Sequence, residues 1–175
     1  MKILLAAVNA KYIHSNLAVY SLKAYAEDPA VEIGEYTINQ QKDDILMDIY
    51  KRQPDILCLS CYIWNLDYIE EIVLEIGKLR PDMPIWLGGP EVSYHAEEML
   101  EQYPFLDGIM KGEGEITFRE LAVYYQNQEN GTEGKTLEEI HGITYRDAEG
   151  AIKSNPWRPV MDLSEVDFPY ANLKK

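Results

Sequence analysis

The sequence is poor in positive charge. Its 175 residues include 16 lysines and arginines against 30 aspartates and glutamates, which gives a formal net charge of −14 at pH 7. A surface of this sign repels phosphate backbones and anionic membrane faces, and no basic patch interrupts it. We therefore expect neither nucleic acid nor a membrane surface as a principal partner.

Long hydrophobic runs are also missing. The apolar stretch Ile3–Val8 is interrupted by the polar Asn9 and Lys11, far short of the length that spans a bilayer, and no small-residue cleavage pattern follows it. The stretch therefore predicts a buried first strand rather than a signal peptide or an anchor.

Cysteine is scarce, with only Cys58 and Cys61 in a CxxC spacing. A zinc site needs more ligands than the neighbouring sequence offers, and a redox pair normally opens a helix. Cys58 instead lies within an apolar strand, so both residues are interpreted as buried small side chains in a reducing, cytoplasmic protein.

What the sequence does contain is a repeated alternation of short apolar strands and amphipathic helices, bounded by prolines, asparagines and glycines. Such an alternation predicts right-handed crossovers and an α/β fold: a doubly wound, Rossmann-like or flavodoxin-like five-stranded parallel sheet with helices on both faces. The expected strands are 3–8, 31–38, 55–60, 84–87 and 107–110, and the first two expected helices are 16–27 and 42–53. A third helix is capped by Asn65 and runs to Leu79, and a fourth is capped by Ser93 and runs to Tyr103. The last helix is marked by Phe118, Leu121, Ala122 and Tyr125.

The C-terminal part has a different character. Residues 126–136 are polar and predict a surface loop, whereas 142–146 and 151–154 alternate in period two and predict a β-hairpin. Residues 155–175 contain three prolines and little that forms a core, which is typical of a linker. We therefore expect a Rossmann-type domain at 1–128, followed by a loop, hairpin and linker at 129–175.

Several strand exits carry residues suited to a ligand. In a doubly wound sheet the ligand crevice lies outside the carboxyl ends of the strands, and paired glycines let a backbone approach a flat ligand closely. The exits combine amides, hydroxyls, aromatics and bare glycine backbone, and no lysine-bearing phosphate loop of the required spacing is present, so they favour a large, flat, amide-rich ligand. The candidate residues are Asn9 and Tyr12 after the first strand, Ser60, Cys61 and Tyr62 at the third, Gly88, Gly89, Pro90 and Glu91 at the fourth, and Gly112, Glu113, Gly114 and Glu115 after the fifth.

Each exit also has a plain structural interpretation. The diglycine is compatible with a tight turn, Tyr62 with a cap on the core, and Glu113 and Glu115 with carboxylates that favour the dipole of a helix start.

In their order and spacing these motifs resemble a known family, the N-terminal cobalamin-binding domain of B12-dependent radical SAM enzymes. The resemblance covers essentially the whole chain. It rests on Leu87–Glu91 before a helix, on Gly112–Glu115 with Phe118 and Leu121 behind it, on Ser60 at the end of the third strand, on the hairpin from Gly142, and on Asp167-Phe168-Pro169-Tyr170.

The resemblance implies a cobalamin-binding module, with the nucleotide tail near Gly88 and Gly89 and with Ser60 and the Gly112–Glu115 amides on the tail or the corrin. The family's CxxxCxxC motif is absent, so the chain looks like a domain of a longer protein and is not expected to be catalytic alone. The implied partner is a radical SAM barrel of the same polypeptide, with a [4Fe-4S] cluster and S-adenosylmethionine, for methyl transfer or other radical chemistry.

His14 is the candidate axial ligand of cobalt. Methionine-synthase-like proteins supply such a histidine from a DxHxxG loop, but the loop here, 12–17, lacks the aspartate and the glycine. Without a carboxylate to fix its tautomer, His14 has other interpretations: a hydrogen bond to a corrin amide or to the partner domain, or a structural role.

Other functions on the same fold stay open. A receiver-like signalling domain needs an aspartate where Ser60 stands and acidic residues near Asn9, and a flavin site needs a hydroxyl-rich first loop where Lys11, Tyr12 and Ile13 stand. A module without a ligand that only docks a partner is the third alternative.

Overall fold

Seven strands form a single sheet in the computed structural model, which describes residues 1–10, 15–162 and 164. The order is β2-β1-β3-β4-β5-β6-β7; the first five are parallel, and β6 and β7 are antiparallel to their neighbours. The predicted doubly wound α/β class is confirmed. The bounds are β1 Ile3–Asn9, β2 Val31–Thr37, β3 Ile56–Ser60, β4 Ile85–Gly88, β5 Gly108–Met110, β6 Ile143–Arg146 and β7 Ile152–Ser154.

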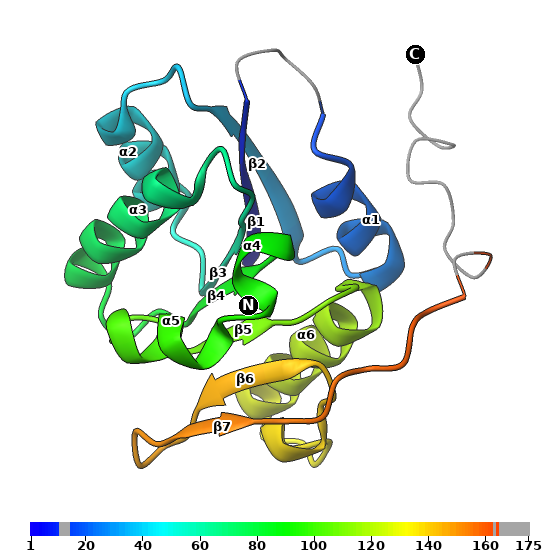
Figure 1. The fold of residues 1–175 in the computed structure, drawn as a ribbon. Helices are drawn as coiled ribbons and strands as arrows, with labels where there is room; N and C mark the ends of the chain where they lie inside the picture. Colours follow the sequence, from blue (N-terminus) through cyan, green and yellow to red (C-terminus); the bar gives the residue numbers. More distant parts are fainter. Residues whose placement is uncertain (11–14, 163, 165–175) are drawn as a thin grey trace.

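Helices cover both faces of the sheet (Figure 1). α1 (Leu17–Ala26) and α6 (Glu115–Asn130) pack on one face, while α2 (Lys42–Arg52), α3 (Leu66–Leu79) and α5 (Ala96–Gln102) pack on the other. The short α4 (Pro90–Ser93) follows β4, and a 3-10 helix, η1 (Leu137–Glu139), precedes β6. No helix in the described ranges is long and apolar enough to cross a membrane.

Strand β1 shows why the sheet is central. Successive side chains of a strand point to opposite faces, and every residue of β1 is buried. Leu4, Ala6 and Val8 belong to the core under α2, α3 and α5, whereas Ile3, Leu5 and Ala7 belong to the core under α1 and α6. Burial on both faces matches the continuous apolar run in the sequence.

Three expectations differ from the structure. The helix expected from a Ser93 cap to Tyr103 is two helices, α4 and α5, and Ser93 is the last residue of α4 rather than a cap. The polar loop expected from residue 126 begins later, because α6 continues to Asn130 and ends at Gly131 in the left-handed conformation (φ 64°). The final turns of α6 are polar because they lie beyond the core and need no buried face.

The predicted hairpin is also more than an appendage. β6 pairs with the edge of β5, with Ile109 opposite Thr144, so the hairpin extends the parallel sheet to seven strands. Thr144 and Tyr145 are buried there. The hairpin is thus part of the same core as the strands that carry the candidate site.

Candidate functional site

A cavity of about 560 Å³, the main cavity, lies at the carboxyl ends of the parallel strands. Its inner end, where the lining side chains are buried, is apolar and is formed by Leu5, Cys58 and Val19, from β1, β3 and α1. Three parallel strand exits surround it, as the topology requires. The predicted residues that line it are Ser60, Tyr62, Gly88, Gly89, Pro90, Gly112, Glu113, Gly114 and Glu115.

The remaining predicted residues lie elsewhere. Cys61 is fully buried behind the cavity wall, and Glu91 and Asn9 do not line the cavity. Tyr12 and His14, together with the Asp167–Tyr170 segment, lie outside the described residues. The structure therefore brings together the exits of β3, β4 and β5.

The diglycine turn is held against the exit of β3. Gly89 has φ of 116° and ψ of 171°, and a Cβ atom there would lie 2.3 Å from the carbonyl oxygen of Cys61. The amide of Cys61 in turn donates to the carbonyl of Gly88 at 2.7 Å. Gly88 is different, since a Cβ atom there would meet Met110 at 3.6 Å, an ordinary contact. Gly89 is therefore required by the backbone packing, while Gly88 borders the cavity.

Ser93 joins the two glycine turns. Its Oγ donates to the carbonyl of Gly89 at 2.7 Å and accepts from the amide of Gly112 at 3.1 Å. The side chain is buried, so both bonds are protected from water. A single hydroxyl thus fixes the spacing between the exits of β4 and β5.

A buried polar cluster supports the exits of β1 and β3. Asn65, at the start of α3, donates to the carbonyls of Val8 and Ser60 at 2.9 and 3.0 Å and accepts from the amide of Tyr62 at 2.8 Å. Beside it, the side chain of Asn9 donates to Glu35 at 3.1 Å. Asn65 thus occupies the predicted N-cap position of α3, but its side chain makes no cap bond and instead joins the ends of β1 and β3.

The two acidic residues of the second glycine turn are both bonded within the protein. Glu113 accepts from the amide of Met161 at 2.9 Å, and Glu115 accepts from the hydroxyl of Ser21 at 2.8 Å. Their carboxylates therefore serve to tie α1 and the C-terminal segment to this turn.

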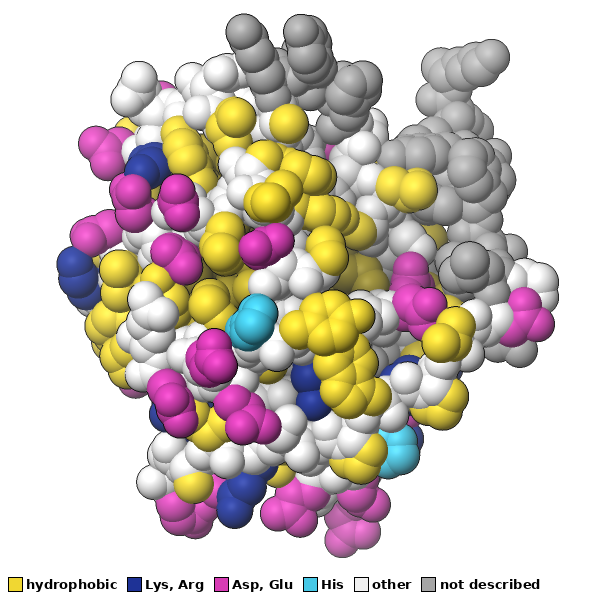
Figure 2. Space-filling model, in the orientation of Figure 1, with side chains coloured by type: hydrophobic (Ala, Val, Ile, Leu, Met, Phe, Trp, Pro, Cys, Tyr) yellow, Lys and Arg dark blue, Asp and Glu magenta, His cyan; other side chains and the backbone are white. Residues whose placement is uncertain are grey.

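Residues 155–161, the strap, form a wall of the main cavity. Trp157, Arg158 and Val160 line it, and the ring centroid of Trp157 lies 5.3 Å from that of Tyr94. Hydrophobic side chains gather around α4 on this face (Figure 2). Among the residues that line the main cavity, Tyr94, Trp157 and Val160 are exposed.

Lys111 is a buried cation at the exit of β5. Its Nζ donates to Ser154 Oγ at 3.0 Å and to the carbonyl of Asn155 at 2.9 Å, and it lies 5.4 Å from the centroid of the Trp157 ring. Burial lowers the pKa of this ammonium, with a smaller opposing effect from Glu97. Lys111 and Trp157 also border a smaller cavity of about 280 Å³.

Neither cysteine behaves as a reactive thiol. Burial raises the pKa of Cys58 to about 12 and raises that of Cys61 as well, and thiols in that state are poor nucleophiles and poor metal ligands. Within the ranges that the structure describes, no group of histidine, cysteine and carboxylate side chains could hold a metal ion.

The sequence did not identify several cavity residues. The α1 side chains carried only an ordinary core pattern, Ser93 was interpreted as a helix cap, and the strap was interpreted as a linker. Only the aromatic character of Trp157, beside prolines in a polar segment, marked the strap as unusual.

Comparison with known proteins gives consistent matches. The family model described as "B12 binding domain" matches residues 3–122. The 2-(S-pantetheinyl)-carbapenam-3-carboxylate methyltransferase of Streptantibioticus cattleyicolor is 28% identical over 156 residues, which cover 85% of this chain and 22% of that protein. The cobalamin-dependent radical SAM methyltransferase TokK of Streptomyces tokunonensis is 36% identical over 69 residues, 39% of this chain and 10% of TokK.

A solved structure has the same fold. The cobalamin-dependent S-adenosylmethionine radical enzyme OxsB, with aqua-cobalamin and S-adenosylmethionine bound, aligns with a TM-score of 0.70 at 24% identity. The alignment covers 91% of this chain and 22% of OxsB. This chain therefore spans a minor part of the length of each of these relatives.

Proposed function

Since this chain belongs to the B12 binding domain family, we propose that its cobalamin sits in the main cavity, with the nucleotide tail at the inner end and the corrin ring at the mouth. The observation that carries the proposal is the shape and lining of that cavity. Its inner end is apolar and lies between the sheet and α1, while its mouth is formed by glycine turns and aromatic side chains.

The residues present fit such a ligand. The nucleotide base of cobalamin is flat and aromatic, and the buried side chains of Leu5, Val19 and Cys58 offer it an apolar surface. At the mouth, Gly88 and Gly112 present backbone without a side chain, which allows close approach of the ligand. The volume of about 560 Å³ accommodates the tail and leaves the corrin ring at the surface.

The roles we propose place most of the predicted residues in two groups. Ser60, Tyr62 and Pro90, with the two glycine turns, contact the ligand, because they line the cavity. Cys61 and Asn9 do not contact the ligand in this proposal; their hydrogen bonds fix the exits of β3 and β1. Axial ligation of cobalt by His14 stays a prediction.

For the longer protein we propose a radical SAM barrel that follows this module and carries a [4Fe-4S] cluster and S-adenosylmethionine. The support is the kind of relative that the chain matches. Bound cobalamin would supply a transferable methyl group, and this module would orient the corrin towards the barrel. The proposed division is 1–128 for the cobalamin-binding domain and 129–175 for the connection, although β6 and β7 complete the same sheet.

The proposed placement of the tail is tested with two ligands. Hydroxocobalamin has the nucleotide tail, whereas cobinamide has the corrin ring without it. Ala18 lines the cavity from α1, so Ala18→Leu places three additional carbon atoms in the space of the tail. We expect equilibrium dialysis to show about tenfold weaker binding of hydroxocobalamin by this variant, because the added carbon atoms occupy the space of the tail, and unchanged binding of cobinamide.

Ala24→Leu is the matched control, because Ala24 lies on the same helix, is exposed and does not line the cavity. If neither corrinoid binds to the unaltered protein, the proposed function is rejected. An equal loss of both ligands on Ala18→Leu would reject the placement of the tail.

A further inference from the structure

We infer that the strap is part of the cobalamin site: Trp157 forms the wall that contacts the corrin ring, and Arg158 is a positioning residue that holds Trp157 at the mouth. The inference rests on the proposed function and adds to it a segment of the chain that the family match, residues 3–122, does not include.

Trp157 is packed on three sides by residues of the site. Tyr94 lies against it with a tilt of 34° between the rings, and Lys111 lies under the ring at 5.4 Å. A Cβ atom on Gly112 would meet the indole ring at 3.5 Å, so the indole packs directly on the second glycine turn. Although packed in this way, Trp157 is still 46% exposed. A large aromatic side chain that is fixed in place and half exposed at a cavity is suited to contact a ligand.

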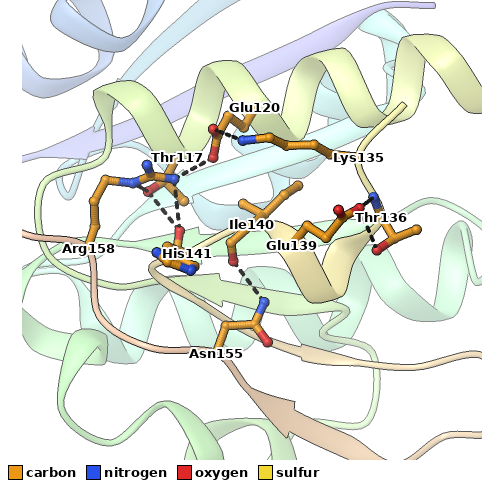
Figure 3. Close-up of polar contacts among 9 residues, drawn as sticks. All are labelled: Thr117, Glu120, Lys135, Thr136, Glu139, Ile140, His141, Asn155 and Arg158. Carbon is orange, nitrogen blue, oxygen red and sulfur yellow. Dashed lines mark hydrogen bonds and ion pairs between the residues drawn. The ribbon is translucent and has the colours of Figure 1, made fainter. Parts of the chain in front are cut away.

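Asn155 and Arg158, which lie before and after Trp157 in the chain, are anchored to the body of the domain by their side chains (Figure 3). Before it, Asn155 Nδ2 donates to the carbonyls of Leu137 and Ile140 at 2.7 and 2.8 Å. After it, Arg158 donates from Nε to Thr117 Oγ1 at 3.1 Å, and its Nη2 bonds both the carbonyl of His141 at 3.2 Å and the carboxylate of Glu120. Such bonds on both sides restrict the positions that Trp157 can take.

The position of the strap selects the part of the ligand that it contacts. The inner end of the main cavity is made by buried side chains such as Leu5 and Cys58, whereas Trp157, Tyr94 and Val160 are exposed. The strap therefore borders the mouth, where the corrin ring is placed, and not the space of the nucleotide tail. The apolar methyl groups at the rim of a corrin match an indole face.

The test of Trp157 uses the same two ligands with the 175-residue chain. Because hydroxocobalamin and cobinamide share the corrin ring, Trp157→Ala should weaken the binding of both by about tenfold, which is the effect of removing a well-packed aromatic contact. Trp157→Phe should restore part of the loss. The Ala18→Leu variant should weaken the binding of hydroxocobalamin alone. Loss of affinity for both ligands therefore identifies the contact with the corrin ring, and loss for hydroxocobalamin alone identifies the contact with the tail.

The test of Arg158 exploits its shared partner. Glu120 also accepts from Lys135 at 2.6 Å. In the described part of the chain, the ion pair of Lys135 is with Glu120 and not with a residue of the strap, so Lys135→Met is a matched control that removes one ion pair of the same carboxylate. Arg158→Met should raise the dissociation rate of both corrinoids several-fold, while Lys135→Met should leave it unchanged. The double variant Trp157→Ala/Arg158→Met should bind no more weakly than Trp157→Ala, because Arg158 acts through Trp157.

Three results would overturn the inference: unchanged affinity of Trp157→Ala, a loss confined to hydroxocobalamin, or additive losses in the double variant. Absence of binding by the unaltered protein would overturn the proposed function together with this inference, whereas these three results leave the proposed function intact. If Trp157→Ala does not fold, amide hydrogen exchange of the strap in the unaltered protein decides: hydroxocobalamin should slow it, and an unchanged rate would reject the contact.

Discussion

Replacement of Gly89 by alanine should destabilise the domain whether or not cobalamin is present. The added Cβ atom would lie 2.3 Å from the carbonyl oxygen of Cys61, inside the distance at which real contacts occur. In addition, φ of 116° with ψ of 171° is a conformation that essentially only glycine adopts. Either the exit of β3 or the turn itself must move.

The magnitude follows from these two effects. The backbone conformation costs about 1 to 3 kcal/mol for a residue other than glycine, and forcing an extra carbon into a packed interior costs about 1 to 3 kcal/mol. A total of about 4 kcal/mol lowers the melting temperature by about 8 to 16 °C for a chain of this length.

Thermal and urea unfolding, followed by circular dichroism, measure the effect, and Gly88→Ala is the matched control. The atoms nearest to a Cβ atom on Gly88 belong to Met110, the first at 3.6 Å, which is an ordinary contact distance, so this variant should unfold within about 0.5 kcal/mol of the unaltered protein. If Gly89→Ala were as stable as Gly88→Ala, the assignment of Gly89 to the backbone packing would be wrong, and the diglycine would have to be explained by the ligand alone.

Three further predictions concern side chains that form hydrogen bonds within the domain. Tyr125→Phe should lower the free energy of unfolding in urea by about 1 to 3 kcal/mol, because Trp86 Nε1 donates to the Tyr125 hydroxyl at 2.8 Å and would be left unpaired. An unchanged free energy of unfolding would mean that another acceptor takes the place of this hydroxyl. Ser93→Ala should cost a similar amount and weaken hydroxocobalamin binding, since it removes the bonds to Gly89 and Gly112; unchanged affinity would contradict the role of Ser93 in spacing the turns. Burial alone would raise the pKa of Glu120, but the hydrogen bonds from Lys135 and Arg158 outweigh it and hold the pKa below its usual value of 4.5. The stability that Glu120 contributes is thus present above pH 4.5 and lost as the pH falls through the lowered pKa. The difference in melting temperature between the unaltered protein and Glu120→Gln should therefore disappear at low pH. A difference that persists at low pH would refute this ion pairing.

The parallel core of the fold could be predicted because its signals are local. Buried strands such as β1 are continuous apolar runs, and the helices between them have apolar faces at helical spacing, as in α3 with Ile69, Ile72 and Val73. The hairpin was likewise visible in its alternation. Its pairing with β5 was not, because strand partners far apart in the sequence are chosen by the edge that the sheet leaves open.

The candidate site was predictable where it depends on topology and less so where it depends on packing. The exits of β3, β4 and β5 meet at one cavity because parallel strands end at one edge of the sheet. That Gly89 is required by the backbone packing, while Gly88 is not, depends instead on a contact with Cys61, which no local pattern specifies. The same holds for the strap, whose place depends on the acceptors that Arg158 and Asn155 find on distant segments.

The antiparallel pairing of β6 and β7 also sets the direction in which the chain leaves the sheet. β5 runs towards its carboxyl edge, β6 runs back, and β7 runs forward again. These two reversals bring the chain back to the carboxyl edge of the sheet, where β5 ends, whereas a single added strand would have left it at the amino edge. The chain therefore leaves β7 at the same edge of the sheet as the main cavity, so Trp157, Arg158 and Val160 line that cavity without the chain having to cross the sheet.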